Sequence, residues 1–231
     1  KWTFWKKETE YEVYNNPWNE ITLTDYESHM SLASIMQLQA LNKLIKGQLK
    51  AWPVSSTMIL GIAGGNGLEH IRDSGIKKVY GVDINAAYLS ETSVRYQDLG
   101  NILELLCIDL HKCSGKLPRA ELLIANLLVE YIGCGCFRQV VQQVEPIYVS
   151  CVIQVNTGVS WVSDSPYLHV FDGLKRVYHQ IDADMLRESM SGIGYRYIGA
   201  LEYPLPNGKK LVRLDFEEGS MDMLLPDCMV G

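Results

Sequence analysis

The sequence predicts an α/β protein with a mostly parallel seven-stranded sheet, helices on both faces and an antiparallel hairpin at its end. Short apolar runs alternate with helical stretches between residues 58 and 155, and this alternation is typical of βαβ units with a parallel sheet. Further along, Asn207-Gly208 separates two extended runs. This pair is the strongest short-range signal for a hairpin, because both residues tolerate a positive φ.

The elements are expected in the following order. Strands should occupy 58–63, 77–84, 102–110, 121–126 and 148–155. A short helix should end at Gly75, and longer ones should cover 85–100, 127–144 and 182–194. Residues 157–180 have weak periodicity and should form a connection over one edge of the sheet. The hairpin strands should cover 195–206 and 209–217.

The N-terminal part has a different composition, with seven aromatic residues among residues 1–26. Thr24 and Glu27 have the spacing of a capping box, which predicts a helix over about 25–50 that ends near Trp52-Pro53. We therefore divide the chain into an aromatic segment with a cap helix, 1–52, and a binding domain, 53–231.

Composition and charge exclude several classes of protein. The chain has 231 residues, of which 47% are apolar, so it is neither disordered nor collagen-like. A net charge of −6 disfavours nucleic acid as a partner. The six cysteines are interpreted as reduced thiols of a cytoplasmic protein, without a metal site. We expect no membrane span and no signal peptide, and because residue 1 is lysine, a start just inside the natural protein.

A glycine cluster, Gly64, Gly65 and Gly67, lies between a strand and a helix in MILGIAGGNGLEHI (58–71). Glycines there allow a sharp turn and a close approach of a ligand to the backbone. No lysine follows at the position that a phosphate-binding P-loop requires, and no three glycines have the G-x-G-x-x-G spacing of dinucleotide sites. A nicotinamide oxidoreductase is therefore a weaker alternative.

Three polar residues follow successive strands: Asp83, Asp109 and Asn126. Taken singly, Asp83 could be a helix N-cap and Asp109 a turn residue. Together with the glycine cluster, they are expected at one edge of the parallel sheet, where ligands of such sheets bind. A carboxylate at the position of Asp83 could accept both hydroxyls of a ribose.

On these residues, the chain resembles the class I S-adenosylmethionine-dependent methyltransferases over about residues 55–218. The family's first loop has the pattern acidic-x-G-x-G-x-G, and the corresponding stretch here is Gly61-Ile62-Ala63-Gly64-Gly65-Asn66-Gly67. Gly65 and Gly67 match the pattern. Ala63 replaces the first glycine and Gly61 the acidic residue, which removes a contact often made to the methionine end.

The resemblance implies a Rossmann-like methyltransferase fold and S-adenosylmethionine as the cofactor. It implies that Asp83 holds the ribose, that Ile84 and Leu110 enclose the adenine, that Asp109 accepts from the exocyclic amine, and that Asn126 lies beside the sulfonium. The residues expected to bind the cofactor are Ala63, Gly64, Gly65, Gly67, Asp83, Ile84, Asp109, Leu110 and Asn126.

Methyl transfer from a sulfonium requires an acceptor held in line and no metal or nucleophile of the protein. Candidate acceptor-binding residues are Tyr26, His29, Glu130 and Tyr131. Alternatively, His29 is a solvated residue near a helix start and Glu130 an ordinary acid of a first helical turn. Tyr167, His169, Tyr178 and His179 are further candidates for the roof of the site, although each could lie in a surface loop.

The acceptor is expected to be a small molecule or a protein side chain. The stretch Asn126-Leu127-Leu128-Val129 lacks the Asn-Pro-Pro-Tyr type signature of enzymes that methylate base amines. Catalytic residues and the oligomeric state stay open. The missing acid at Gly61 and the absence of a clear base leave one alternative, a module that binds S-adenosylmethionine without transferring its methyl group, as a sensor or partner subunit.

Overall fold

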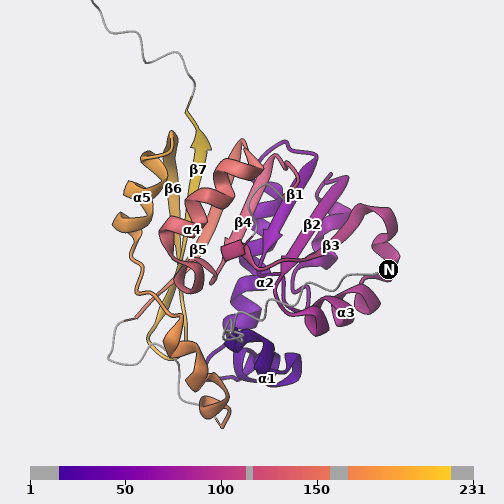
Figure 1. Ribbon diagram of the computed structural model, residues 1–231, viewed down its shortest axis with the longest axis vertical. Helices are drawn as coiled ribbons and strands as arrows, with labels where there is room; N and C mark the ends of the chain where they lie inside the picture. Colours follow the sequence, from indigo (N-terminus) through magenta and orange to yellow (C-terminus); the bar gives the residue numbers. More distant parts are fainter. Residues whose placement is uncertain (1–15, 113–116, 157–165, 220–231) are drawn as a thin grey trace, which may run out of the picture.

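A seven-stranded sheet forms the centre of the computed structural model, which describes residues 16–112, 117–156 and 166–219 (Figure 1). The strand order is β3-β2-β1-β4-β5-β7-β6. Strands β1 to β5 are parallel, and β7 pairs antiparallel with both β5 and β6. The strands are β1 (Ser56–Leu60), β2 (Lys78–Asp83), β3 (Leu103–Cys107), β4 (Leu122–Asn126), β5 (Tyr148–Val155), β6 (Tyr195–Pro204) and β7 (Lys210–Glu218).

Helices cover both faces of this sheet (Figure 1). One face packs against α4 (Val129–Val144) and α5 (Ala183–Ser191). The other packs against α2 (Gln37–Lys50), α3 (Ala86–Arg95) and the 3₁₀ helices η2 (Leu68–Asp73) and η3 (Gln97–Ile102). Strands buried on both faces have continuous apolar runs, as β1 and β4 do.

The remaining elements lie beyond one end of the sheet. They are α1 (Leu23–Ser31) and the 3₁₀ helices η1 (Pro17–Glu20), η4 (Leu110–Lys112) and η5 (Leu168–Arg176). Trp18 and Tyr26, from η1 and α1, pack with Phe171 and Leu174 of η5. A roof is thereby formed over the carboxyl ends of the parallel strands (Figure 1).

The predicted α/β fold is confirmed, including the parallel part and the terminal hairpin. At the hairpin, Gly208 has φ 81° and donates its N–H to the carbonyl of Leu205 at 3.1 Å. Of the Asn-Gly pair, only this glycine uses the left-handed region.

The single helix expected over 25–50 is wrong, because α1 ends at Ser31 and α2 begins at Gln37. The apolar stripe continues through Leu32 and Ile35, but Met36 has φ 54° and turns the chain. The predicted capping box at Thr24 is also wrong. Thr22 caps α1, and its hydroxyl accepts from Asp25 N at 3.1 Å.

The described cysteines, Cys107, Cys134, Cys136 and Cys151, are free thiols. The described part of the chain contains no cluster of His, Cys, Asp and Glu suited to a metal ion. Within the same residues, no helix is long and apolar enough to cross a membrane. The predicted Cys113 and Cys228 thiols lie outside the described residues.

Candidate functional site

A cavity of about 460 Å³ opens at the carboxyl ends of β1 to β4, where the strand order reverses between β1 and β4. Open parallel sheets bind ligands at this switch point, and the volume lies in the usual range for small-molecule sites. Its floor consists of residues that follow the four strands: Gly61, Ala63, Val82, Asp83, Ile84, Ile108, Asp109, Leu110, His111, Lys112, Asn126, Leu127 and Leu128. Its roof is formed by Asn16, Trp18, Tyr26, Tyr88, Tyr131, Ile132, Arg176, Val177 and His179.

Asp83 ends β2 with a buried carboxylate that joins two loops. Its Oδ2 accepts from Ala63 N and its Oδ1 from Asn85 N, each at 2.9 Å. Burial raises the pKa of Asp83, although these hydrogen bonds act to lower it. An ionised carboxylate has about four acceptor positions, so acceptor capacity remains for a donor within the cavity. Asn85, rather than Asp83, caps α3.

The glycine loop after β1 turns with three positive φ angles, at Ala63 (47°), Gly65 (80°) and Gly67 (97°). A Cβ at Gly65 would approach Tyr96 to 2.7 Å, and one at Gly67 would approach Ile45 to the same distance. Gly65 and Gly67 therefore serve the packing of the loop and do not line the large cavity. Gly64 lines a separate cavity of about 40 Å³ behind the loop.

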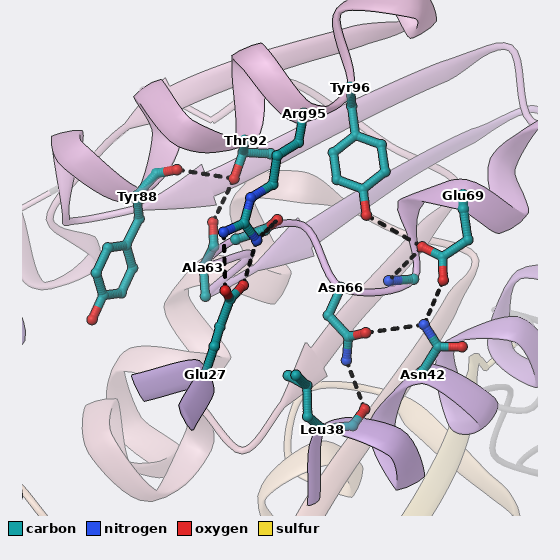
Figure 2. A network of polar contacts seen from close by, with 12 residues as sticks. Glu27, Leu38, Asn42, Ala63, Asn66, Glu69, Tyr88, Thr92, Arg95 and Tyr96 are labelled. Atoms are coloured by element: carbon teal, nitrogen blue, oxygen red, sulfur yellow. Dashed lines mark hydrogen bonds and ion pairs between the residues drawn. The ribbon is translucent and has the colours of Figure 1, made fainter. Parts of the chain in front are cut away.

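Groups from three helices hold this loop in place (Figure 2). From α1, the Glu27 carboxylate forms a two-pronged ion pair with Arg95 of α3, with Nη2–Oε2 at 2.9 Å. The Thr92 hydroxyl of α3 donates to the carbonyl of Ala63 at 2.7 Å. From the loop, Asn66 donates its side-chain amide to the carbonyl of Leu38 in α2 at 2.9 Å. The helix expected to cap the site thus contacts the loop directly.

Asp109 and its apolar neighbours form the wall below β3. The Asp109 Oδ1 accepts from His111 N at 3.1 Å, and Oδ2 pairs with Lys112 Nζ at 3.3 Å. Asp109 therefore does act as a turn residue, as its alternative interpretation held, while it also lines the cavity. Ile84 and Leu110 line the same cavity and give this end an apolar surface.

Asn126 ends β4 and is held by Gln48 of α2, which the sequence did not single out. The two side-chain amides exchange two hydrogen bonds of 2.9 Å each. Gln48 is fully buried and also donates to the Ser150 hydroxyl at 2.9 Å. The next residue, Leu127, has φ 52°, which is strained for a side chain of this size. The backbone at this strand end is therefore held in a conformation that its sequence does not favour.

An aromatic wall consists of Tyr88, Tyr26, Trp18, Tyr131 and Tyr178, of which the first four line the large cavity and Tyr178 lines a neighbouring one. Successive ring centroids are 6.2, 6.1, 4.9 and 6.0 Å apart. Burial raises the pKa of Tyr26 and that of Tyr131 above the ordinary value, so both phenols are neutral near pH 7. Trp18 and Tyr26 belong to the aromatic-rich N-terminal part that the sequence marked, whereas the other three rings come from later elements.

A second cavity, of about 70 Å³, adjoins the large cavity along this wall. Trp18, Tyr26, Leu127 and Tyr131 line both cavities. The remaining lining residues of the second one are His29, Met30, Gln37, Glu130, Gln154, Phe171, Leu174 and Tyr178. Two predicted acceptor-binding residues, His29 and Glu130, thus line the second cavity and not the large one.

The other roof candidates have different positions. His179 lines the large cavity and Tyr178 the small one. Tyr167 packs against the cluster around Phe171, and His169 is exposed and pairs with Asp172 at 3.2 Å.

Comparison with known proteins shows the fold. No protein-family model matches the chain, and no curated protein matches it. Among solved structures, the [4+2]-cyclase SpnF is similar with a TM-score of 0.65 and 10% identity, over 88% of this chain and 95% of that one. The N-methyltransferase NodS from Bradyrhizobium japonicum WM9, in complex with S-adenosyl-L-homocysteine, has a TM-score of 0.61 and 11% identity, over 87% and 100%.

The magnesium protoporphyrin IX methyltransferase ChlM from Synechocystis PCC 6803, with bound SAH, has a TM-score of 0.57 and 12% identity, over 85% of this chain and 86% of that one. The predicted Rossmann-like methyltransferase fold is therefore confirmed. The chain has the fold of the class I S-adenosylmethionine-dependent methyltransferases. At these identities, the likeness establishes the fold alone, because one fold hosts many reactions.

Proposed function

We propose that the protein binds S-adenosylmethionine and transfers its methyl group in line to a small molecule or a protein side chain. The observation that carries this proposal is the cavity of about 460 Å³, which brings Ala63, Asp83, Asp109 and Asn126 together at the switch point of the sheet. Neighbours of the same fold, ChlM and NodS, were crystallised with S-adenosylmethionine or its demethylated product.

The lining residues fit this cofactor. Asp83 keeps acceptor capacity for the ribose beyond its backbone partners. Ile84 and Leu110 offer apolar faces for the adenine, and Asp109 an acceptor for its amine. The sulfonium would then lie toward Asn126. Its positive charge supplies the driving force of the reaction, since the neutral thioether is a good leaving group.

Gly64, Gly65 and Gly67 act indirectly in this proposal, since they let α1, α2 and α3 pack onto the cofactor loop. The segment 1–52 serves as the cap of the 53–231 domain. Its described part contributes Trp18 and Tyr26 to the cavity wall. The acceptor enters on the side of Tyr26, His29, Glu130 and Tyr131. A cytoplasmic location and an acceptor other than nucleic acid remain predictions.

Calorimetric titration with S-adenosylmethionine and S-adenosylhomocysteine tests the binding step. Both ligands should give saturable heat. Asp83→Ala should weaken binding by about 1–3 kcal/mol through loss of charge-assisted hydrogen bonds. Asp83→Asn keeps one acceptor oxygen and covers the case in which the alanine variant does not fold. Asp73→Ala, at an exposed aspartate on η2, is the matched control. Absence of heat from folded protein contradicts the proposal.

A binding module without transfer activity is the second candidate. Gly61 stands where the family has an acidic residue, and the side-chain amide of Asn126 already accepts from and donates to Gln48. The likeness to a [4+2]-cyclase also shows that this fold hosts other reactions. Transfer of a tritiated methyl group to an acceptor supports the enzyme. Tight binding without transfer across a broad acceptor panel supports the module.

A further inference from the structure

Glu130, in the first turn of α4, carries a buried carboxylate with one oxygen unused. The residue is 3% exposed. Its Oε1 accepts from the backbone N–H of Gln154 at 2.8 Å, whereas Oε2 is fully buried and has no hydrogen-bond partner within the described part of the chain. Burying an ionised carboxylate oxygen without a hydrogen-bond partner costs folding free energy, so an oxygen of this kind indicates a partner that binds there. The residue lines the cavity of about 70 Å³.

The walls of this cavity favour a cation. Trp18, Tyr26, Tyr131, Tyr178 and Phe171 line it with aromatic rings, and ring faces attract ammonium groups. Glu130 is the acidic side chain among the described lining residues. His29, the lining residue that could carry a competing positive charge, is kept neutral at pH 7, because burial and Lys209 lower its pKa to about 4.

Size limits the occupant to a few heavy atoms. The cavity has about half the volume of the ~150 Å³ engineered cavity that binds benzene. It shares Trp18, Tyr26, Leu127 and Tyr131 with the large cavity, so the two cavities adjoin and an occupant would lie next to the proposed cofactor site. These dimensions suit the amine end of a small aliphatic molecule.

We propose that the small cavity receives the amino group of a small aliphatic amine, which Glu130 binds through Oε2 and which is the methyl acceptor. This inference rests on the proposed function, because the methyl donor is S-adenosylmethionine in the adjacent cavity. Burial raises the pKa of Glu130 to about 7, so the carboxyl can bind an ammonium when ionised and can hold a proton afterwards.

The step balances in atoms and electrons. The ammonium first loses a proton to Glu130 Oε2, which exposes the nitrogen lone pair. That lone pair forms the N–C bond as the S–C bond breaks, and the electron pair of the broken bond stays on sulfur. The products are a methylated amine and a thioether. For a primary or secondary amine, the methylated nitrogen carries one positive charge, taken from the sulfonium. Water then removes the proton from Glu130.

Calorimetry with dimethylammonium chloride tests the inference, with and without S-adenosylhomocysteine. Propan-2-ol and acetate are neutral and anionic probes of similar size. The wild type and Glu188→Gln, a change at an exposed glutamate on α5, should bind dimethylammonium saturably and not the other two probes. Glu130→Gln should weaken amine binding about tenfold to a hundredfold, because a hydrogen bond to a charged group is lost, while S-adenosylhomocysteine binds unchanged.

Tritiated methyl from S-adenosylmethionine should reach dimethylamine in the wild type and in Glu188→Gln, and at least tenfold more slowly in Glu130→Gln. Absence of saturable amine binding, or equal binding by Glu130→Gln and the wild type, overturns the inference whether or not the cofactor binds. Absence of heat from S-adenosylhomocysteine itself overturns the proposed function instead, and the amine titration on the ligand-free protein still decides the acceptor site.

Discussion

Replacing Glu130 by glutamine should stabilise the protein, and increasingly so as the pH rises. The carboxyl of Glu130 has a pKa of about 7 in the folded protein, because burial disfavours its ionised form, against an ordinary value of 4.5. The native state therefore holds this proton over a pH range in which the unfolded chain has released it. Stability from this group is fully present below about pH 4.5 and is lost as the pH rises through 7.

The size of the effect follows from the two pKa values. A difference of about 2.5 pKa units corresponds to roughly 3 kcal/mol at 1.36 kcal/mol per unit, of which about 2.5 kcal/mol falls between pH 5 and pH 8. Glutamine keeps the acceptor for Gln154 N and is neutral at every pH, like the protonated carboxyl. The variant should therefore lack this loss of stability.

Neighbouring groups do not interfere in this pH range. The pKa of His29 is lowered to about 4, and those of Tyr131, Tyr178 and Cys151, which also feel Glu130, are raised by burial. None of these groups changes charge between pH 5 and pH 8. Titrations elsewhere in the chain are common to both proteins and cancel in the comparison.

Urea unfolding of both proteins at pH 5, 6, 7 and 8, followed by circular dichroism, measures the difference. Relative to the wild type, Glu130→Gln should gain about 2.5 kcal/mol between pH 5 and pH 8, a midpoint shift of about 0.8 M at an m-value of ~3 kcal/mol/M. Glu188→Gln should follow the wild type at each pH. Parallel curves for wild type and Glu130→Gln would show that the carboxyl is solvated, and would refute this reasoning.

Three further changes test the support of the site. Gln48→Met keeps the side-chain volume but removes the hydrogen bonds that Gln48 makes to Asn126 and Ser150. We expect it to lower the unfolding free energy in urea by about 1–3 kcal/mol. A decrease no larger than that of Gln142→Met, on the exposed side of α4, would contradict this expectation. Gly67→Ala adds a Cβ 2.7 Å from Ile45 at a φ of 97°, so it should lower the unfolding free energy by at least about 1–2 kcal/mol. Gly135→Ala, with open space around the new Cβ, should be neutral or slightly stabilising, and equal effects of the two alanines would count against the packing argument. Arg95→Met removes the ion pair with Glu27, whose two side chains are 41% and 24% exposed. The cost should be below about 1 kcal/mol and should vanish in 1 M salt, and a loss that ignores salt would refute an electrostatic role.

The sequence predicted the floor of the large cavity because local patterns mark the ends of parallel strands. Asp83 and Asn126 end β2 and β4, and Asp109 follows β3 by two residues. Once the strands are parallel and adjacent, their carboxyl ends must meet at one edge, so residues far apart in the sequence meet without any further assumption. The expected strand bounds differed from the observed ones mainly at these ends, because the apolar run of the sequence continues past the last residue that pairs in the sheet.

The roof and the supports could not be predicted in the same way. Gln48 is a polar residue within the amphipathic pattern of α2, and only tertiary packing brings it to Asn126. The break between α1 and α2 was missed because the apolar period runs on through Leu32 and Ile35. The reason for the break is geometric. Helix α1 covers the end of the sheet while α2 packs along its face, and one straight helix cannot do both.

The least favourable conformations in the described chain lie mostly at the two cavities. Of four non-glycine residues with a positive φ, Ala63 and Leu127 line the large cavity, and Met36 precedes Gln37, which lines the small one. Strained backbone and a desolvated carboxylate lower stability, so the surrounding fold must hold them in place. A ligand that pairs with Glu130 would remove part of this cost. The gain in stability expected of Glu130→Gln and its expected loss of amine binding therefore have one cause, the burial of a carboxylate whose Oε2 has no hydrogen-bond partner among the described residues.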